Sequence, residues 1–122
     1  MTESLVLPYR YRARLDRIVD ADTLDMTVDL GFRTTRKTRF RVAGIDAWEV
    51  RGEEREKGLE ASRFVAGWAK TADVDGWPFI IDSHRDSTGK YGRWLADVWR
   101  AVDGAHLATD LVARGHAQHV IY

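Results

Sequence analysis

Five charged side chains in three short segments of the chain have the types and spacing needed for phosphate chemistry. Asp22 lies in VDADTL, Arg41, Asp46 and Glu49 lie in FRVAGIDAWE, and Arg93 lies in KYGRWLA. Carboxylate oxygens are the ligands that hard divalent cations prefer, and arginine pairs bidentately with phosphate oxygens. A further carboxylate beside such a cation can accept a proton from an attacking water. The combination predicts a site that hydrolyses phosphodiesters.

The two metal-binding candidates, Asp22 and Asp46, lie at opposite ends of neighbouring expected strands. Taken alone, each is an ordinary turn aspartate, and so is Asp20, which precedes Asp22 by two residues. In a meander, however, the start of one strand lies beside the end of the next, so the two carboxylates can meet at one rim. Carboxylates forced together repel each other unless a cation lies between them. A set of oxygen ligands favours Ca²⁺ or Mg²⁺ over zinc or copper.

The other three candidates also have ordinary structural interpretations. Glu49 is followed by an acidic run and could be a surface residue at the approach to a helix. Arg93 could be an exposed arginine at the start of a strand. Arg41 lies five residues before Asp46, an odd offset that puts the two side chains on opposite faces of a strand unless the chain bends at Gly44. If both arginines reach the site, they would stabilise the dianionic transition state of phosphodiester hydrolysis.

Hydrophobic periodicity predicts the elements that must position these residues. Apolar and polar side chains alternate in the first two strand segments, residues 78–83 form a short apolar run, and apolar side chains recur at helical spacing in the first helix segment. Gly58 weakens the early turns of the first helix, and Gly115 is expected at the C′ position of the second. The expected strands cover residues 9–16, 24–30, 39–45, 78–83 and 93–100, and the expected helices cover residues 53–70 and 106–114.

This order of elements predicts a mainly β protein with helices (α+β), built on a five-stranded OB-type barrel with two or three helices. The whole chain, residues 1–122, is expected to form one domain, with residues 1–7 as a loose N-terminal tail. Trp68, Trp77 and Trp99 are expected in the core. Trp48 and Trp94 flank catalytic candidates, where they either pack on the rim or stack on bases.

Composition limits the classes of protein that fit. There is no cysteine, which excludes disulfides and thiolate metal sites, and 19 basic side chains balance 19 acidic ones. Residues 10–17 and 33–41 are locally rich in arginine, either as solvated strand faces or as a basic rim that guides a polyanion. No apolar run is long enough for a signal-peptide core or a membrane span, which favours a cytoplasmic protein without a membrane partner. We expect a monomer.

The motifs together resemble the staphylococcal nuclease (thermonuclease) family over nearly the whole domain, from about Arg14 to Val120. Such a spread is far more specific than any one short motif. The segments that carry the resemblance are VDADTL, FRVAGIDAWE, GLEASRF, KYGRWLA and LVARGHA.

The resemblance implies a role for each matching position. Asp22 and Asp46 match the family's metal carboxylates, and Ala47 matches the residue whose backbone carbonyl binds Ca²⁺. Asp20 matches an acid close to the metal. The remaining matches are Glu49 to the glutamate assigned to the attacking water, Arg41 and Arg93 to the phosphate-binding arginines, and Lys90 and Tyr91 to contacts with the terminal phosphate of a bound nucleotide.

The chain also departs from the family pattern. Trp48 replaces the usual proline between the metal aspartate and the glutamate, which removes a fixed φ and adds a large ring beside Glu49. Ala21 stands where glycine is usual, so the turn there must avoid positive φ. Ile121, followed by Tyr122, stands where the family has a tyrosine that packs against the nucleotide.

The function that these features imply is a Ca²⁺-dependent nuclease that hydrolyses DNA with little sequence preference, with RNA left open as a second substrate. By resemblance, the P–O5′ bond breaks and 3′-phosphate ends remain. Two alternatives stay open at this point. One is a non-catalytic OB-fold module that binds nucleic acid or protein, and the other is a nuclease that needs a partner to select its substrate.

Overall fold

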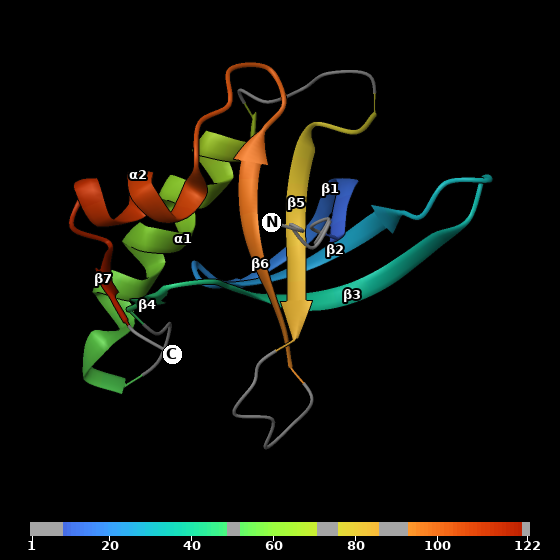
Figure 1. The fold of residues 1–122 in the computed structure, drawn as a ribbon. Coiled ribbons are helices and arrows are strands. Elements are labelled where there is room, and N and C mark those ends of the chain that lie inside the picture. The colour runs from blue at the N-terminus through green and yellow to red at the C-terminus, as the bar shows by residue number, and fades with distance from the viewer. Residues whose placement is uncertain (1–8, 49–51, 71–75, 86–92, 121–122) are drawn as a thin grey trace, which may run out of the picture.

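A closed five-stranded barrel forms the centre of the molecule (Figure 1). The computed structural model describes residues 9–48, 52–70, 76–85 and 93–120. Neighbouring strands around the barrel follow the order β1-β2-β3-β6-β5. The barrel strands are β1 (Tyr9–Asp20), β2 (Thr23–Asp29), β3 (Thr35–Val42), β5 (Phe79–Arg85) and β6 (Trp94–Arg100).

The pairing of these strands is that of an OB-type barrel, which confirms the predicted fold class. β1, β2 and β3 form an antiparallel meander, and β5 pairs antiparallel with β6. β3 pairs parallel with β6, and the first half of β1 pairs with β5 and closes the barrel. The register of β1 on β2 shifts twice in its second half, and such irregularities let one long strand bend between two partners.

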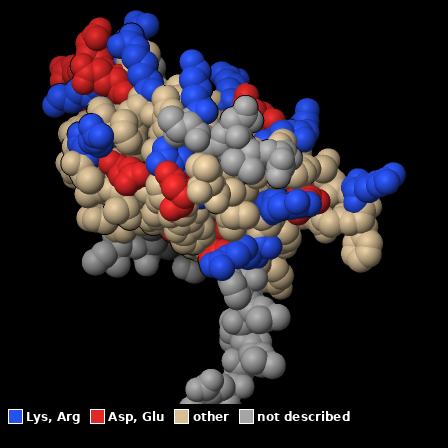
Figure 2. Space-filling model, turned by 90° about the horizontal axis from the view of Figure 1, so that it is seen from above, with Lys and Arg blue, Asp and Glu red and all other residues tan. Residues whose placement is uncertain are grey.

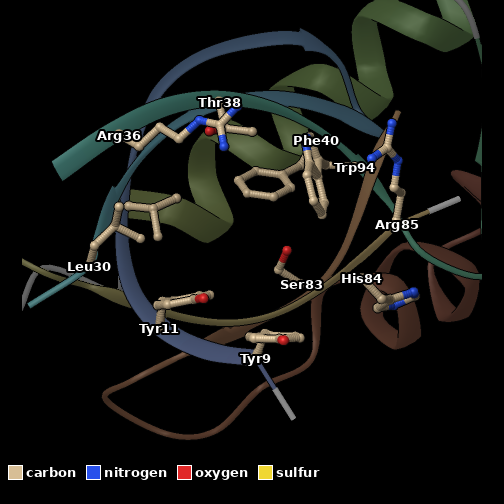
Figure 3. Close-up of a pocket in the computed structure, with 11 residues that line it drawn as sticks. Tyr9, Tyr11, Leu30, Arg36, Thr38, Phe40, Ser83, His84, Arg85 and Trp94 are labelled. Atoms are coloured by element: carbon tan, nitrogen blue, oxygen red, sulfur yellow. The ribbon is translucent and has the colours of Figure 1, made fainter. Parts of the chain in front are cut away.

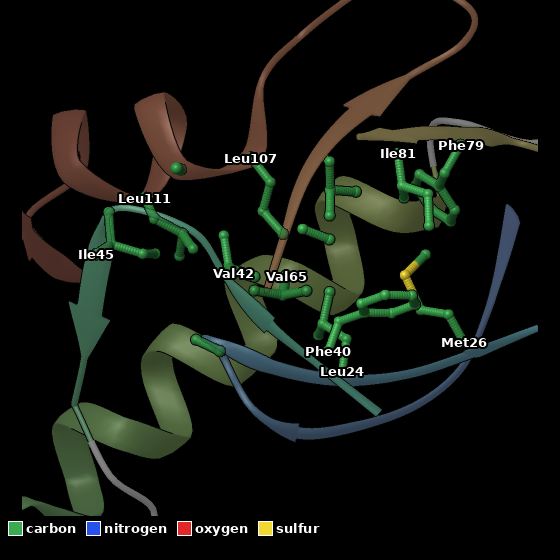
Figure 4. Close-up of a cluster of buried hydrophobic side chains, with 14 of the residues drawn as sticks. Leu24, Met26, Phe40, Val42, Ile45, Val65, Phe79, Ile81, Leu107 and Leu111 are labelled. Carbon is green, nitrogen blue, oxygen red and sulfur yellow. The ribbon is translucent and has the colours of Figure 1, made fainter. Parts of the chain in front are cut away.

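Alternating apolar side chains on the strands fill the barrel (Figure 4). On β2, Leu24, Met26 and Val28 are all buried, as the alternation in the sequence predicts. Phe40 and Val42 of β3 add to the same core. The core therefore holds the meander together and fixes which side chains of β2 and β3 face outward.

The helices α1 (Arg55–Lys70) and α2 (Leu107–Ala113) lie together at one side of the barrel (Figure 1). Trp68 joins them: its ring stacks on Phe79 at 5.8 Å, and its Nε1 donates a 2.9 Å hydrogen bond to Asp110 of α2. Gly115 has φ +74°, and its N–H donates to the carbonyl of Val112, so α2 ends at the expected C′ glycine. No helix in the described ranges is long and apolar enough to cross a membrane.

The third strand differs from its predicted bounds. It was expected over residues 39–45, but β3 already ends at Val42, and Ile45 begins a separate short strand, β4 (Ile45–Ala47). Gly44, with φ +78°, turns the chain between the two strands. β4 pairs with β7 (Ala117–His119), which the sequence analysis missed because three residues carry too little alternation to be recognised.

Two expectations about packing and helix bounds were also imprecise. Of the three tryptophans expected in the core, Trp68 is buried, but Trp77 and Trp99 are half-buried. Arginine guanidinium groups lie over both half-buried rings, at 5.0 Å for Arg14 on Trp77 and 5.5 Å for Arg10 on Trp99. The first helix was expected from residue 53, whereas a 3₁₀ turn, η1 (Gly52–Glu54), precedes α1.

We predict opposite stability changes for alanine at two glycines. Gly44→Ala should lower the free energy of unfolding by about 1 kcal/mol, because an L-residue at positive φ is strained. Gly67→Ala in α1 should raise it by about 0.5–1 kcal/mol, because alanine favours the helix. A Cβ at either position meets no atom within 4 Å, so sterics do not mask the comparison. Urea midpoints measure both, and equal shifts in the same direction would contradict the prediction.

Candidate active site

An open polar cleft of about 990 Å³ lies where β1 ends, β2 begins and β3 gives way to β4. It contains Asp22 and Asp46, which were predicted to meet at one rim, and also Arg41, which the resemblance alone had placed there. The residues that line the cleft are Asp20, Asp22, Thr23, Arg41, Asp46, Ala47, Trp48, Glu53, Glu54 and Gln118.

Asp22 is the most enclosed acidic group of this cleft, with 7% of its surface exposed. Its Oδ2 accepts a 3.0 Å hydrogen bond from the N–H of Ala47, and its Oδ1 accepts one of 3.2 Å from the Thr23 hydroxyl. Its backbone carbonyl accepts a 2.8 Å hydrogen bond from the N–H of Val42. These bonds tie the β1–β2 turn to the end of β3 and to β4.

Arg41 lies between the two predicted metal ligands. Its Nη2 is 3.6 Å from Oδ2 of Asp22 and is in direct contact with Oδ1 of Asp46. The turn at Gly44 explains how an odd offset of five residues still brings Arg41 and Asp46 to the same side. One positive charge is thus shared by two carboxylates, of which Asp46 is half exposed and Asp22 is largely covered.

The arrangement fits a divalent cation, because both carboxylates already share a single cationic nitrogen. Their oxygens are hard donors of the kind that Ca²⁺ prefers, and a Ca²⁺ ion would take further oxygens from water or phosphate. Within the described ranges there is no group of three or more acidic or histidine side chains placed to hold a metal. Ala47 contributes its N–H to Asp22, and the role of its carbonyl as a metal ligand stays a prediction.

The other predicted site residues are placed as follows. Asp20 lines the cleft. Arg93 is exposed, directly precedes β6, and is not among the described residues that line the cleft. Glu49, Lys90 and Tyr91 lie outside the described residues, and so do Ile121 and Tyr122.

Trp48 packs on the rim of the cleft, the first of the two arrangements considered for it. The residue is half-buried, and its Nε1 donates a 3.4 Å hydrogen bond to the carbonyl of Gly115. The Nζ of Lys57 lies 4.7 Å from the centroid of its ring. The indole therefore anchors the end of β4 to the segment after α2. This contact restricts the backbone at a position where proline would restrict it by fixing φ.

Sequence reasoning missed four residues of the cleft. Thr23 donates to Asp22, and Gln118 lies opposite Asp46 in the β4–β7 pair. Glu53 and Glu54 were expected only as part of the first helix, whereas η1 places them along the cleft. The acidic residues are evident in the sequence, but whether they line the cleft depends on the 3₁₀ turn η1, which hydrophobic periodicity does not predict.

The arginine-rich strands do not form one uncompensated basic rim. Arg10 pairs with Asp82, Arg12 with Asp29 and Arg39 with Asp25, each directly across neighbouring strands. The hydrogen bonds from Arg39 lower the pKa of Asp25, and those from Arg10 lower the pKa of Asp82. Figure 2 shows acidic and basic side chains interspersed over the face seen there.

Comparisons with known proteins do not assign the chain: no family model matches it, and no curated protein matches it. The resemblance to the thermonuclease family therefore rests on the motifs in the sequence and stays a prediction.

We predict that Ca²⁺ raises the melting temperature of the protein and that Asp46→Ala abolishes the rise. An ion that binds only the folded state stabilises it by about 1.4 kcal/mol at ten times its Kd, a shift of a few degrees for a domain of this size. Calorimetry or thermofluorimetry with Ca²⁺ and with chelator measures it. Asp82→Ala removes an equal charge from the barrel and should keep the rise. A rise that survives in Asp46→Ala would place the ion elsewhere.

Arg41→Gln should have two opposite effects. In chelator it should lower the free energy of unfolding by about 1–3 kcal/mol, because two facing carboxylates lose their shared cation. With Ca²⁺ the variant should gain more stability than the parent, because the ion no longer competes with the guanidinium. Arg39→Gln removes an exposed pair and should change either quantity by less than about 1 kcal/mol. An unaltered Ca²⁺ effect in Arg41→Gln would refute the competition.

Proposed function

We propose that this protein is a Ca²⁺-dependent phosphodiesterase that hydrolyses DNA, and RNA if its site accepts the ribose, with little sequence preference. One observation carries the proposal: Asp22, Arg41 and Asp46 converge in an open polar cleft. In this cleft Arg41, the proposed phosphate-binding group, contacts both of the proposed cation ligands, Asp22 and Asp46. That combination suits a phosphodiester, whose hydrolysis needs its negative charge compensated in the transition state.

The carboxylates of Asp22 and Asp46, with the carbonyl of Ala47, would hold the cation. When bound, the cation would supply positive charge to a phosphoryl oxygen. The hydrogen bonds from Ala47 and Thr23 keep Asp22 oriented, so the ligand does not have to be ordered on binding. The exposed Asp46 leaves the cleft open on the side from which a polymer can enter.

Arg41 is placed to bind the phosphate of the substrate. Its guanidinium reaches anionic oxygens in the cleft, and a phosphate presents the same paired oxygens in a geometry that arginine matches with two hydrogen bonds. Arg93 is proposed as the second arginine, by its position in the KYGRWLA motif. The parallel pairing of β3 with β6 supports this, because it places the segment that Arg93 begins beside Arg41.

Glu49 is proposed to accept the proton of the attacking water, and Lys90 and Tyr91 to contact a terminal phosphate. The anchored ring of Trp48 supports the role of Glu49, because it holds the preceding residue at the cleft. Arginine, lysine and carboxylate side chains in such a cleft contact the phosphates and the cation, and they do not distinguish one base from another. Little sequence preference is therefore expected of the cleft.

A direct test is incubation of the protein with labelled single-stranded DNA, duplex DNA and RNA, each with Ca²⁺, Mg²⁺ or chelator. The proposal requires cleavage with Ca²⁺ that chelator abolishes, and products that carry 3′-phosphates. Binding without cleavage in every condition would favour the non-catalytic OB-fold module instead.

Glu49→Gln should lower kcat by about 10²–10⁴-fold, the usual contribution of a general base, while Ca²⁺ affinity changes little. Glutamine keeps the size of the side chain but loses the basic oxygen. Glu60→Gln, an exposed substitution on α1, is the matched control and should leave the rate unchanged. Unchanged cleavage in Glu49→Gln would remove this residue from the mechanism.

Arg93→Lys should lower kcat by about 10²-fold or more, by analogy with the loss of one transition-state donor, because lysine keeps the charge but loses the planar fork. Arg39→Lys on β3, which pairs with Asp25 outside the cleft, should cleave at the parent rate. Turnover of Arg93→Lys close to that of the parent would exclude Arg93 from the chemistry.

A further inference from the structure

A second cavity, of about 450 Å³, opens at the mouth of the barrel where β1 begins, β2 ends and β5 ends. Among the residues that the structure describes, it shares none with the polar cleft described above. Its size falls within the range of small-ligand sites, which are concave and mostly apolar with a few polar groups. Nothing in the proposed hydrolysis uses it.

Four aromatic side chains are among the described residues that line it. Figure 3 shows the rings of Tyr9 and Tyr11 on one side of the opening and those of Phe40 and Trp94 on the opposite side. Tyr9 is 71% exposed, so its ring is accessible to a ligand at the opening. Facing rings at such an opening can hold a flat aromatic group between them.

The rim of this cavity is basic. Arg36 and Arg85 flank the opening, and none of the described residues that line it is acidic (Figure 3). Elsewhere on the barrel Arg10 and Arg39 are paired with carboxylates, whereas within the described ranges no carboxylate pairs with Arg36 or Arg85. Arg85 instead lies 5.6 Å from the ring centroid of Trp94. The charge and the walls together favour a ligand with a flat ring and a negative group.

Strands β1, β2 and β3 contribute residues both to this cavity and to the polar cleft. Phe40 lines the cavity and the next residue, Arg41, lines the cleft, since successive side chains of a strand point to opposite faces. Phe40 pairs with Trp94, which directly follows Arg93. From Arg36 to Arg41 the strand spans roughly 16 Å, a length that a few nucleotides cover.

We propose that the barrel-mouth cavity binds a base of single-stranded nucleic acid between its aromatic walls, with the neighbouring phosphates at Arg36 and Arg85. The base must be unstacked to enter, so the site selects single strands over duplexes, whose bases are stacked inside the helix. The inference deepens the proposed nuclease function by naming its substrate as single-stranded. The binding itself needs neither the cation nor the catalytic groups.

The test is fluorescence anisotropy of a labelled oligothymidylate of roughly twelve nucleotides, within the length that one OB barrel covers. Chelator is present, so that binding is measured without cleavage. Tyr9→Leu should weaken binding by roughly 5- to 150-fold, the loss of one stacked base, while Tyr9→Phe keeps the ring and the affinity. Tyr9 is exposed, so the fold should tolerate both changes. A duplex of the same sequence should bind more weakly than the single strand, in spite of its greater charge.

The basic rim is tested by salt dependence. Arg36→Gln should lower the slope of log K against log salt by about 0.7, the loss of one phosphate contact on a single strand. Arg63→Gln on α1 makes the same charge change away from the cavity and should leave the slope unchanged. Equal slopes in both variants and the parent would overturn the assignment of phosphate to Arg36.

Failure of this inference differs from failure of the proposed function. Binding that depends on Tyr9 but is not followed by cleavage with Ca²⁺ would leave the cavity assigned and refute the nuclease. Binding that is lost in Arg41→Gln but unchanged in Tyr9→Leu would place the strand in the cleft alone and overturn the cavity. An apolar dye that binds the cavity and is not displaced by the oligonucleotide would also overturn it.

Discussion

The carboxylate of Asp22 is the group on which the geometry of the cleft depends. It is nearly excluded from water, and a charge in that position is tolerated only where hydrogen bonds and a nearby cation replace its hydration. The N–H of Ala47, the Thr23 hydroxyl and the guanidinium of Arg41 provide that replacement. The interactions that make the burial of Asp22 possible also join the β1–β2 turn to β3 and β4. The same interactions therefore stabilise the rim and keep a negative charge in the cleft.

The barrel could be predicted from sequence where the pattern is long and strict. On β2, Leu24, Met26 and Val28 alternate with polar residues, and burial follows that alternation except at Thr27, which is also buried and donates a hydrogen bond to Asp16. β4 and β7 could not be predicted, because each has three residues and exists only through the pairing that the end of α2 permits. The predicted bounds of the third strand were wrong because a single glycine, Gly44, separates β3 from β4.

The site shows the same division between local and tertiary information. Asp22 and Asp46 could be expected to meet, because in a meander the start of one strand lies beside the end of the next. The position of Arg41 could not be derived, since it depends on how sharply the chain turns at Gly44. Glu53 and Glu54 line the cleft from η1, the 3₁₀ turn that stands where the first residues of the expected helix were predicted. The residue types therefore suggested the proposed chemistry, whereas the turns at Gly44 and η1 determine which side chains lie together in the cleft.

The closed barrel has a consequence for the order in which the site assembles. The contacts among β1, β2 and β3 join segments close in the chain, whereas the β1–β5 seam joins residues about seventy positions apart, such as Arg10 and Asp82. Closing a longer loop costs more chain entropy, and pairings of high sequence separation form slowly. The acidic half of the cleft thus belongs to the locally connected part of the chain, and the segment that Arg93 begins joins it across a long-range seam. In a chain whose barrel has not yet closed, Asp22, Arg41 and Asp46 would already lie close together, whereas β6 would not yet have joined β3.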